Sequence, residues 1–310
     1  MMKKALLAAL LSCSFSAWAL PFGSQHALVF EETSGKVILE KNAHEVVPIA
    51  SLTKLMTAMV ILDAKLDMEE QVAIDEADVD TLKFSSSRVP VGAVLSRNAL
   101  MHLSLMSSDN RAAAALARTY PGGNAAFNAA VREKLRALGM HNTSIEEPTG
   151  LSPHNRSTAA DLLKMATAAS YYPEIARLST GTGETFDFNG NPVQYRNTNR
   201  LIGKDGWDIQ LSKTGFTREA GRCLIMRMQA AGKNVIVVLL NARENAARLL
   251  DAENIQRYLS GEPVLVAKAP ASAPVAKQAR VVRKTNQKQA GVVMVKSKVP
   301  QKAQKKRPTV

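Results

Sequence analysis

The 310-residue sequence contains only two cysteines, and this scarcity restricts its chemistry. Cys13 lies in an N-terminal segment that is predicted to be removed, which leaves Cys223 alone and excludes an internal disulfide. We expect Cys223 to be a small buried apolar residue and not a reactive thiol. The five histidines have no metal-ligand spacing, so the sequence predicts neither a metal site nor a cofactor.

The sequence also lacks a hydrophobic run long enough to span a bilayer. Residues 5–11 are apolar but too few, and they follow the basic pair Lys3 and Lys4. Ala17-Trp18-Ala19 is a small-x-small cleavage signal, so residues 1–19 are predicted to be a secretory signal peptide cut after Ala19. The sequence before Cys13 loosely resembles a lipoprotein site but fits it poorly. Export to the periplasm is therefore expected.

Acidic residues are absent after Ala267, where twelve lysines and arginines occur. Together with Lys3 and Lys4, these twelve residues carry one positive charge more than the whole net charge of +13. Residues 20–267 therefore carry a net charge of −1. The basic balance is thus no sign of nucleic-acid binding by the folded part. Residues 267–310 are rich in Ala, Pro, Lys and Gln, which predicts a disordered tail. It is either a solvated linker or a contact for anionic wall polymers or lipid head groups, and sedimentation with isolated sacculi would separate the two.

The order of the expected elements indicates an α+β fold. The expected strands are residues 27–32, 36–40, 209–214, 223–228 and 235–240. The expected helices are residues 51–62, 97–106, an alanine-rich helix ending at 118, a helix capped by Asn124, and residues 159–170 and 243–259. This order favours an antiparallel sheet flanked by helices, with a helical subdomain (about 63–180) inserted in a domain of residues 20–266.

A serine and a lysine lie one turn apart at the start of an apolar helix. Ser51 and Lys54 are at positions i and i+3, which puts both side chains on one helix face. A lysine is costly in apolar surroundings unless it is paired or neutral. A nucleophilic serine beside a lysine that can lose its proton would explain why the lysine is there.

Two further motifs follow in a fixed order. Ser108-Asp109-Asn110 lies between two expected helices, and Lys213-Thr214-Gly215 lies at the end of an expected strand. Either motif alone is compatible with an ordinary helix cap or turn. Together with Ser51 and Lys54 they form the series S-x-x-K, S-D-N, K-T-G, which is typical of enzymes that react with penicillin.

With these motifs the sequence resembles the low-molecular-mass penicillin-binding proteins of the D-alanyl-D-alanine endopeptidase type (the penicillin-binding protein seven type). The likeness covers residues 27–259 and includes the segments 48–51, 105–114, 148–152 and 210–217. It implies a fold of the DD-peptidase and β-lactamase kind. It also implies that the substrates are peptidoglycan stem peptides and that β-lactam antibiotics are covalent inhibitors.

The resemblance and the chemistry assign a role to each residue. Ser51 would attack the carbonyl of a D-Ala peptide bond, and Lys54, if neutral, would accept its proton. Ser108 would relay a proton to the leaving amine. The expected substrate-binding residues are Lys213, Thr214 and Asn110. The resemblance implies an oxyanion hole made by the backbone N–H groups of Ser51 and Phe216.

Three alternatives remain open at this stage. A carboxypeptidase would use the same motifs, and the choice of an endopeptidase rests on the resemblance. A serine β-lactamase must hydrolyse its acyl-enzyme quickly; class A enzymes use a dedicated glutamate for this step, and Glu146 and Glu147 are the candidates here. The third alternative is a non-catalytic wall-binding module that reacts with penicillin.

Overall fold

The computed structural model describes residue 20 and residues 22–265, so the predicted signal peptide and basic tail lie outside the described residues. Within this part of the chain, five antiparallel strands form a sheet with the order β2-β1-β11-β10-β9. These strands are β1 (His26–Glu31), β2 (Lys36–Lys41), β9 (Asp208–Thr217), β10 (Gly221–Ala230) and β11 (Lys233–Ala242). The sheet therefore combines strands from early and late in the sequence, as predicted.

The central strands of the sheet are buried on both faces. In β11, Val235, Val237 and Leu239 pack into one apolar cluster with α7 (Asn245–Leu259). The alternate residues Ile236 and Val238 belong to the other cluster, which contains the helices on the opposite face. Because successive side chains of a strand point to opposite faces, a strand covered on both sides is an uninterrupted apolar run.

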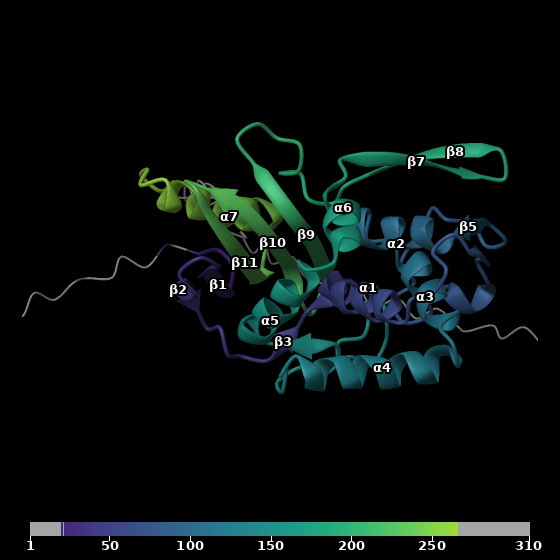
Figure 1. Cartoon of the computed structure of the whole chain (residues 1–310). Coiled ribbons are helices and arrows are strands. Elements are labelled where there is room, and N and C mark those ends of the chain that lie inside the picture. The colour runs from purple at the N-terminus through teal and green to yellow at the C-terminus, as the bar shows by residue number, and fades with distance from the viewer. Residues whose placement is uncertain (1–19, 21, 266–310) are drawn as a thin grey trace, which may run out of the picture. The chain divides into compact units, whose positions relative to one another are not determined.

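The helix α1 (Thr53–Asp63) is the centre of the helical part. Nine of its eleven residues are buried, which agrees with its apolar character on all sides. It contacts α2, α3, α4 and α5, which surround it in Figure 1. The bounds of the remaining helices are α2 (Arg97–Met106), α3 (Asn110–Arg118), α4 (Gly123–Ala137), α5 (Ala159–Ala169) and α6 (Pro173–Thr180).

Six short strands form three small ladders beside this frame. Each ladder is an antiparallel pair: β3 with β6, β4 with β5, and β7 with β8. Their bounds are β3 (Val47–Pro48), β4 (Gln71–Ala73), β5 (Val94–Ser96), β6 (Arg156–Ser157), β7 (Gly183–Phe188) and β8 (Asn191–Arg196). None of the helices in the described residues has the length and apolar character that crossing a membrane requires.

Three local predictions differ from the structure. The helix at Ser51 begins as a 3₁₀ turn, η1 (Ala50–Leu52), that leads directly into α1. Asn124 does not cap α4, because the N-cap is Gly122, whose φ of +85° suits a residue without Cβ. The helix α6 was not predicted; Pro173 is its first residue, a position where the missing N–H costs nothing. The prediction for Cys223 is confirmed, since it is fully buried and burial raises its pKa to about 11.

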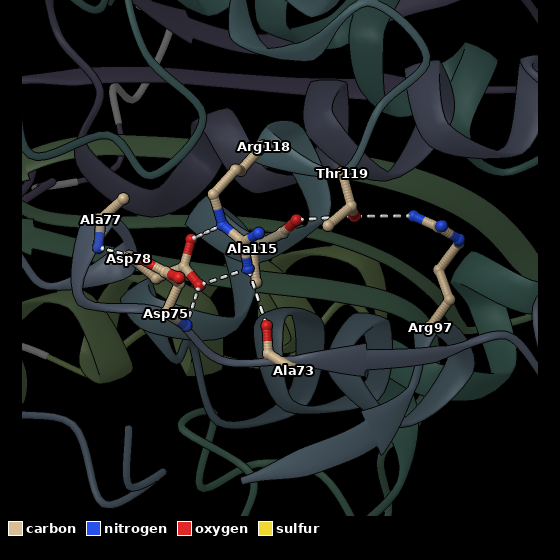
Figure 2. A network of polar contacts seen from close by, with 8 residues as sticks. All are labelled: Ala73, Asp75, Ala77, Asp78, Arg97, Ala115, Arg118 and Thr119. Carbon is tan, nitrogen blue, oxygen red and sulfur yellow. Dashed lines mark hydrogen bonds and ion pairs between the residues drawn. The ribbon is translucent and has the colours of Figure 1, made fainter. Parts of the chain in front are cut away.

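An ion pair between a half-buried arginine and a buried carboxylate fixes the irregular segment that leads to the site. Figure 2 shows Arg118 of α3 donating two hydrogen bonds to Asp78, from Nε to Oδ1 at 2.8 Å and from Nη2 to Oδ2 at 2.9 Å. Nη2 also donates to the carbonyl oxygen of Ala73 at 2.7 Å. Asp78 is only 3% exposed, so water competes little for these bonds. The pair ties the start of residues 75–87 to α3.

A close backbone approach sets the position of η1. Gly150 has a φ of +85°, and a Cβ placed on it would lie 2.0 Å from the carbonyl oxygen of Ala50. Ala50 itself has a positive φ of +47°. Only a residue without a side chain allows the loop at Gly150 to press against the residue before Ser51.

We therefore expect Gly150→Ala to lower the free energy of unfolding by more than about 3 kcal/mol, because it adds a steric clash to an unfavourable φ. Gly92→Ala is the matched control, since Gly92 has a φ of +83° and no atom of the described residues lies within 4 Å of its added Cβ. The control should cost about 1–2 kcal/mol. Urea unfolding measures both, and equal losses would contradict the close approach.

Candidate active site

Ser51 lies between the helical part and the edge strand of the sheet. It is the middle residue of η1, and its side chain is half-buried between the buried residues Ala50 and Leu52. On the sheet side, a Cβ added to Gly215 of β9 would lie 3.1 Å from the Ser51 backbone nitrogen. The third motif thus runs directly past Ser51, and its glycine leaves room for this close approach.

Lys54 points its amine at the Ser51 hydroxyl. Nζ lies 2.9 Å from Ser51 Oγ, 2.7 Å from Asn110 Oδ1 and 2.6 Å from the carbonyl oxygen of Thr149. A neutral amine has two N–H groups and one lone pair. Because the amide oxygen and the carbonyl oxygen can only accept, they take both N–H groups and leave the lone pair for the Ser51 hydroxyl.

Burial favours the neutral form of the Lys54 amine. The side chain has no exposed surface, and desolvation lowers its pKa to about 8. The negative charges of Glu147, Asp109 and Asp80 oppose this shift. With this pKa, about one molecule in ten carries the neutral amine at pH 7.

A second serine–lysine pair lies beside the first. Lys213 of β9 is 1% exposed, and its Nζ donates to Ser108 Oγ at 2.8 Å and to the Thr214 carbonyl at 2.9 Å. Burial lowers the pKa of Lys213 well below its usual value, and the nearby charge of Lys54 adds to this effect. Ser108 lies between α2 and α3 with a φ of +62°, and the following residue, Asp109, caps α3.

The remaining predicted residues lie around the same site. Thr214 Oγ1 donates to Thr198 Oγ1 at 2.7 Å, and Asn110 Nδ2 donates to Ser85 Oγ at 2.8 Å. Phe216 is 50% exposed, and the guanidinium of Arg222 stacks over its ring at 4.1 Å.

Strand geometry fixes the direction of the Phe216 amide. The Ser212 amide points away from β10, because it donates to Ser179 Oγ. Since such groups alternate along a strand, the amide of Phe216 also points away from β10, at the edge of β9 that contacts η1.

A cavity of about 640 Å³ opens in front of the two pairs. Ser51, Ser108, Asn110, Thr214 and Phe216 line it, so it gathers all the predicted residues except the two buried lysines. Its lining also contains residues that the sequence did not indicate: Asn197, Thr198, Arg200, Arg222, Asn245 and Arg248.

The cavity attracts anions. Three arginines line it, and no Asp or Glu is among its lining residues in the described part of the chain. Arg248 is 4% exposed and donates to the Cys223 carbonyl and to Asn245, while its Nε has no partner among the described residues. Burial lowers the pKa of Arg248 to about 10, which still leaves it charged at neutral pH. No sequence signal identified these arginines, because they lie on a loop, on β10 and on α7 and none of them is part of a motif.

Two serine–lysine pairs around one cavity, on a sheet with inserted helices, define a class of serine hydrolases that carry the S-x-x-K, S-D-N and K-T-G motifs. The chain belongs to peptidase family S11, the D-alanyl-D-alanine carboxypeptidase family, whose family model matches residues 15–244. The resemblance inferred from the motifs is confirmed.

Relatives and solved structures agree with this assignment. Two curated relatives named D-alanyl-D-alanine endopeptidase, from Pseudomonas aeruginosa and Escherichia coli, are 46% and 43% identical to this chain. The alignments cover 81% and 80% of this chain, and 81% of each relative. The crystal structure of the Streptomyces K15 DD-transpeptidase matches with a TM-score of 0.72 at 26% identity, over 78% of this chain and 99% of that one.

The site geometry predicts that Lys54 loses its proton at a much lower pH than an ordinary lysine. In NMR spectra of protein with ¹³C-labelled lysine, one signal should have a midpoint near pH 8 and disappear in Lys54→Met. A second signal, whose titration midpoint lies well below that of an ordinary lysine, should disappear in Lys213→Met. If Lys54→Met removed only a signal that titrates above pH 10, the description of Lys54 as a buried amine with a lowered pKa would be wrong.

Proposed function

We propose that this chain is a periplasmic serine DD-endopeptidase that hydrolyses D-Ala–diaminopimelate cross-links of peptidoglycan through an acyl-enzyme on Ser51. The observation that carries the proposal is the position of Lys54 Nζ, 2.9 Å from Ser51 Oγ, with two pure acceptors on its other side. This arrangement gives a general base directed at one hydroxyl.

Acylation follows from the positions of the polar groups. Ser51 Oγ attacks the D-Ala carbonyl carbon while its proton passes to the lone pair of Lys54. The backbone N–H groups of Ser51 and Phe216 stabilise the oxygen that becomes negative. Ser108, which accepts a hydrogen bond from the Lys213 amine, then relays this proton: it gives its own proton to the leaving amine as the C–N bond breaks and takes a replacement from Lys54, which becomes neutral again. Water subsequently hydrolyses the ester and restores the free serine.

The cationic cavity fits the leaving side of the substrate. In the cross-link and in a terminal D-Ala-D-Ala, the nitrogen of the scissile bond is attached to a carbon that bears a free carboxylate. Lys213 and Thr214 hold this carboxylate in the proposed complex, and Arg248 supplies a further buried charge next to it. Asn110 holds the substrate amide or Lys54. Charge-assisted hydrogen bonds of this kind are about twice as strong as neutral ones.

The choice of an endopeptidase over a carboxypeptidase is supported by the names of the two relatives above 40% identity. The family as a whole is described as carboxypeptidase, and the motifs serve both reactions. The difference lies in what extends beyond the scissile bond. A decisive assay therefore contains both substrates.

The β-lactamase alternative loses its candidate bases. Glu147 accepts hydrogen bonds from the backbone N–H groups of Thr149, Gly150 and Ser152, and Glu146 accepts from Ser152 Oγ. Neither carboxylate is among the residues that line the cavity at Ser51, so neither is placed to activate a deacylating water there. We therefore assign β-lactam antibiotics the role of covalent inhibitors that acylate Ser51.

The proposal extends to the organisation of the whole chain, including the parts outside the described residues. Residues 1–19 serve as a signal peptide, and residues 20–266 form the catalytic domain with a helical subdomain at about 63–180. The basic tail, residues 267–310, contacts an anionic wall polymer or membrane surface through its twelve positive charges.

Digestion of purified muropeptides, analysed by mass, tests the proposed function. Cross-linked dimers should be converted to monomers, and pentapeptides should lose D-alanine more slowly. Ser51→Ala should reduce dimer cleavage about a thousandfold or more, because the nucleophile is lost. Ser34→Ala, in the exposed turn between β1 and β2, is the control and should cleave like the unaltered protein. Release of D-alanine without dimer cleavage would identify a carboxypeptidase, and an active Ser51→Ala would refute the mechanism.

A further inference from the structure

We propose that Glu147 is a positioning residue for the base, because it folds the turn that directs the Thr149 carbonyl at Lys54. The inference rests on the proposed function, in which Lys54 accepts the Ser51 proton. Glu147 is not among the residues that line the cavity at Ser51, and outside the β-lactamase alternative neither the motifs nor the family comparison gives it a role. It acts through the backbone of the loop that follows it.

The Glu147 carboxylate is the centre of the turn. Oε2 accepts from the backbone N–H of Thr149 at 2.7 Å and from the Thr149 hydroxyl. Oε1 accepts from the backbone N–H of Gly150 at 2.6 Å, from that of Ser152 at 3.2 Å and from Asn155 Nδ2 at 3.0 Å. One side chain thus satisfies five donors of residues 149–155, which forces the intervening backbone into a tight turn.

The turn is also attached to the elements that carry Ser51 and Lys54. Asn155 Nδ2 donates to Thr53 Oγ1 at 3.2 Å, and the Asn155 carbonyl accepts from the Ile49 backbone N–H at 3.0 Å. Thr57 Oγ1 of α1 donates to the Pro148 carbonyl at 2.8 Å. The loop is therefore fixed against the residues before and after Ser51.

This attachment decides where the Lys54 lone pair points. The neutral amine donates its two N–H groups to Asn110 Oδ1 and to the Thr149 carbonyl. If the Thr149 carbonyl moved away, Lys54 could rotate and present an N–H group to Ser51 instead of the lone pair. A misplacement of about 1 Å at such a centre can cost about a hundredfold in rate.

Glu147 also acts on Lys54 through its charge. The titratable groups around Lys54 are Glu147 on the loop, Asp80 on the segment before α2, Asp109 at the start of α3 and Lys213 on β9. Among the carboxylates, Glu147 contributes most to keeping the Lys54 pKa from falling further. Loss of its charge should therefore lower the pH at which Lys54 becomes neutral.

Glu147→Gln separates this role from a purely structural one. All five partners of Glu147 are donors, so the amide NH₂ group of glutamine would face donors on one side of the turn. Glu147→Asp keeps the charge but is one methylene shorter. Glu146→Gln is the control, because Glu146 is exposed and, within the described part of the chain, accepts a single side-chain hydrogen bond, from Ser152 Oγ.

The experiment measures the rate of Ser51 acylation by a fluorescent penicillin between pH 6 and pH 10, at the level of the second-order rate constant. For the unaltered protein, the rate should rise with pH through a midpoint near 8. For Glu147→Gln, we expect the midpoint to move to lower pH by about half a unit or more, and the plateau to fall about tenfold to a hundredfold. Glu147→Asp should keep a midpoint near 8 with a smaller fall in the plateau, and Glu146→Gln should change neither.

The outcomes separate the inference from the function on which it rests. If Glu147→Gln kept both the midpoint and the plateau, the positioning role would be wrong. A lower plateau at an unchanged midpoint would mean that Glu147 has only a structural role, and this result would also overturn the positioning role. If Glu147→Gln does not fold, an unchanged plateau in Glu147→Asp would overturn the positioning role in its place. If the unaltered protein is not acylated at Ser51 at any pH, the proposed function itself fails.

Discussion

The burial of one amine is the constraint on which the rest of this structure depends. Lys54 sits on a helix that is buried on nearly all sides, and an ordinary ammonium group there would be costly. The protein meets this cost with three acceptors for Nζ and with a pKa lowered to about 8. The same desolvation that destabilises the charged lysine makes it a base near neutral pH, so the cost in stability and the proposed chemistry have one physical cause.

The site exists only where the two halves of the fold meet. α1 and the turn before it provide Lys54 and Ser51, the junction of α2 and α3 provides Ser108, and β9 provides Lys213. Each lysine contacts a serine, but the second pair joins residues 105 positions apart. Gly150 and Gly215 allow the loop and the strand to approach η1 closely. Packing between the helical part and the sheet therefore fixes the geometry of the cavity as well as the stability of the chain.

The sequence predicted those parts of the site that depend on local spacing or on a known motif. Ser51 and Lys54 are one turn apart, and the apolar runs in β10 and β11 identify the sheet. The Thr149 carbonyl was not predictable, because a backbone oxygen has no sequence signature. Arg248 could not be predicted either, since only the packing of α7 on the sheet brings it to the cavity. The short helix α6 was missed because eight residues after a proline give little periodicity.

The most direct test of the account is the site of covalent attachment of a penicillin. The folded protein is labelled at neutral pH, digested and analysed by mass spectrometry. The account predicts one adduct, on the peptide that contains Ser51, and its loss in protein unfolded before labelling. An adduct on any other residue, or no adduct on the folded protein, would contradict the claim that the buried Lys54 amine makes Ser51 the nucleophile.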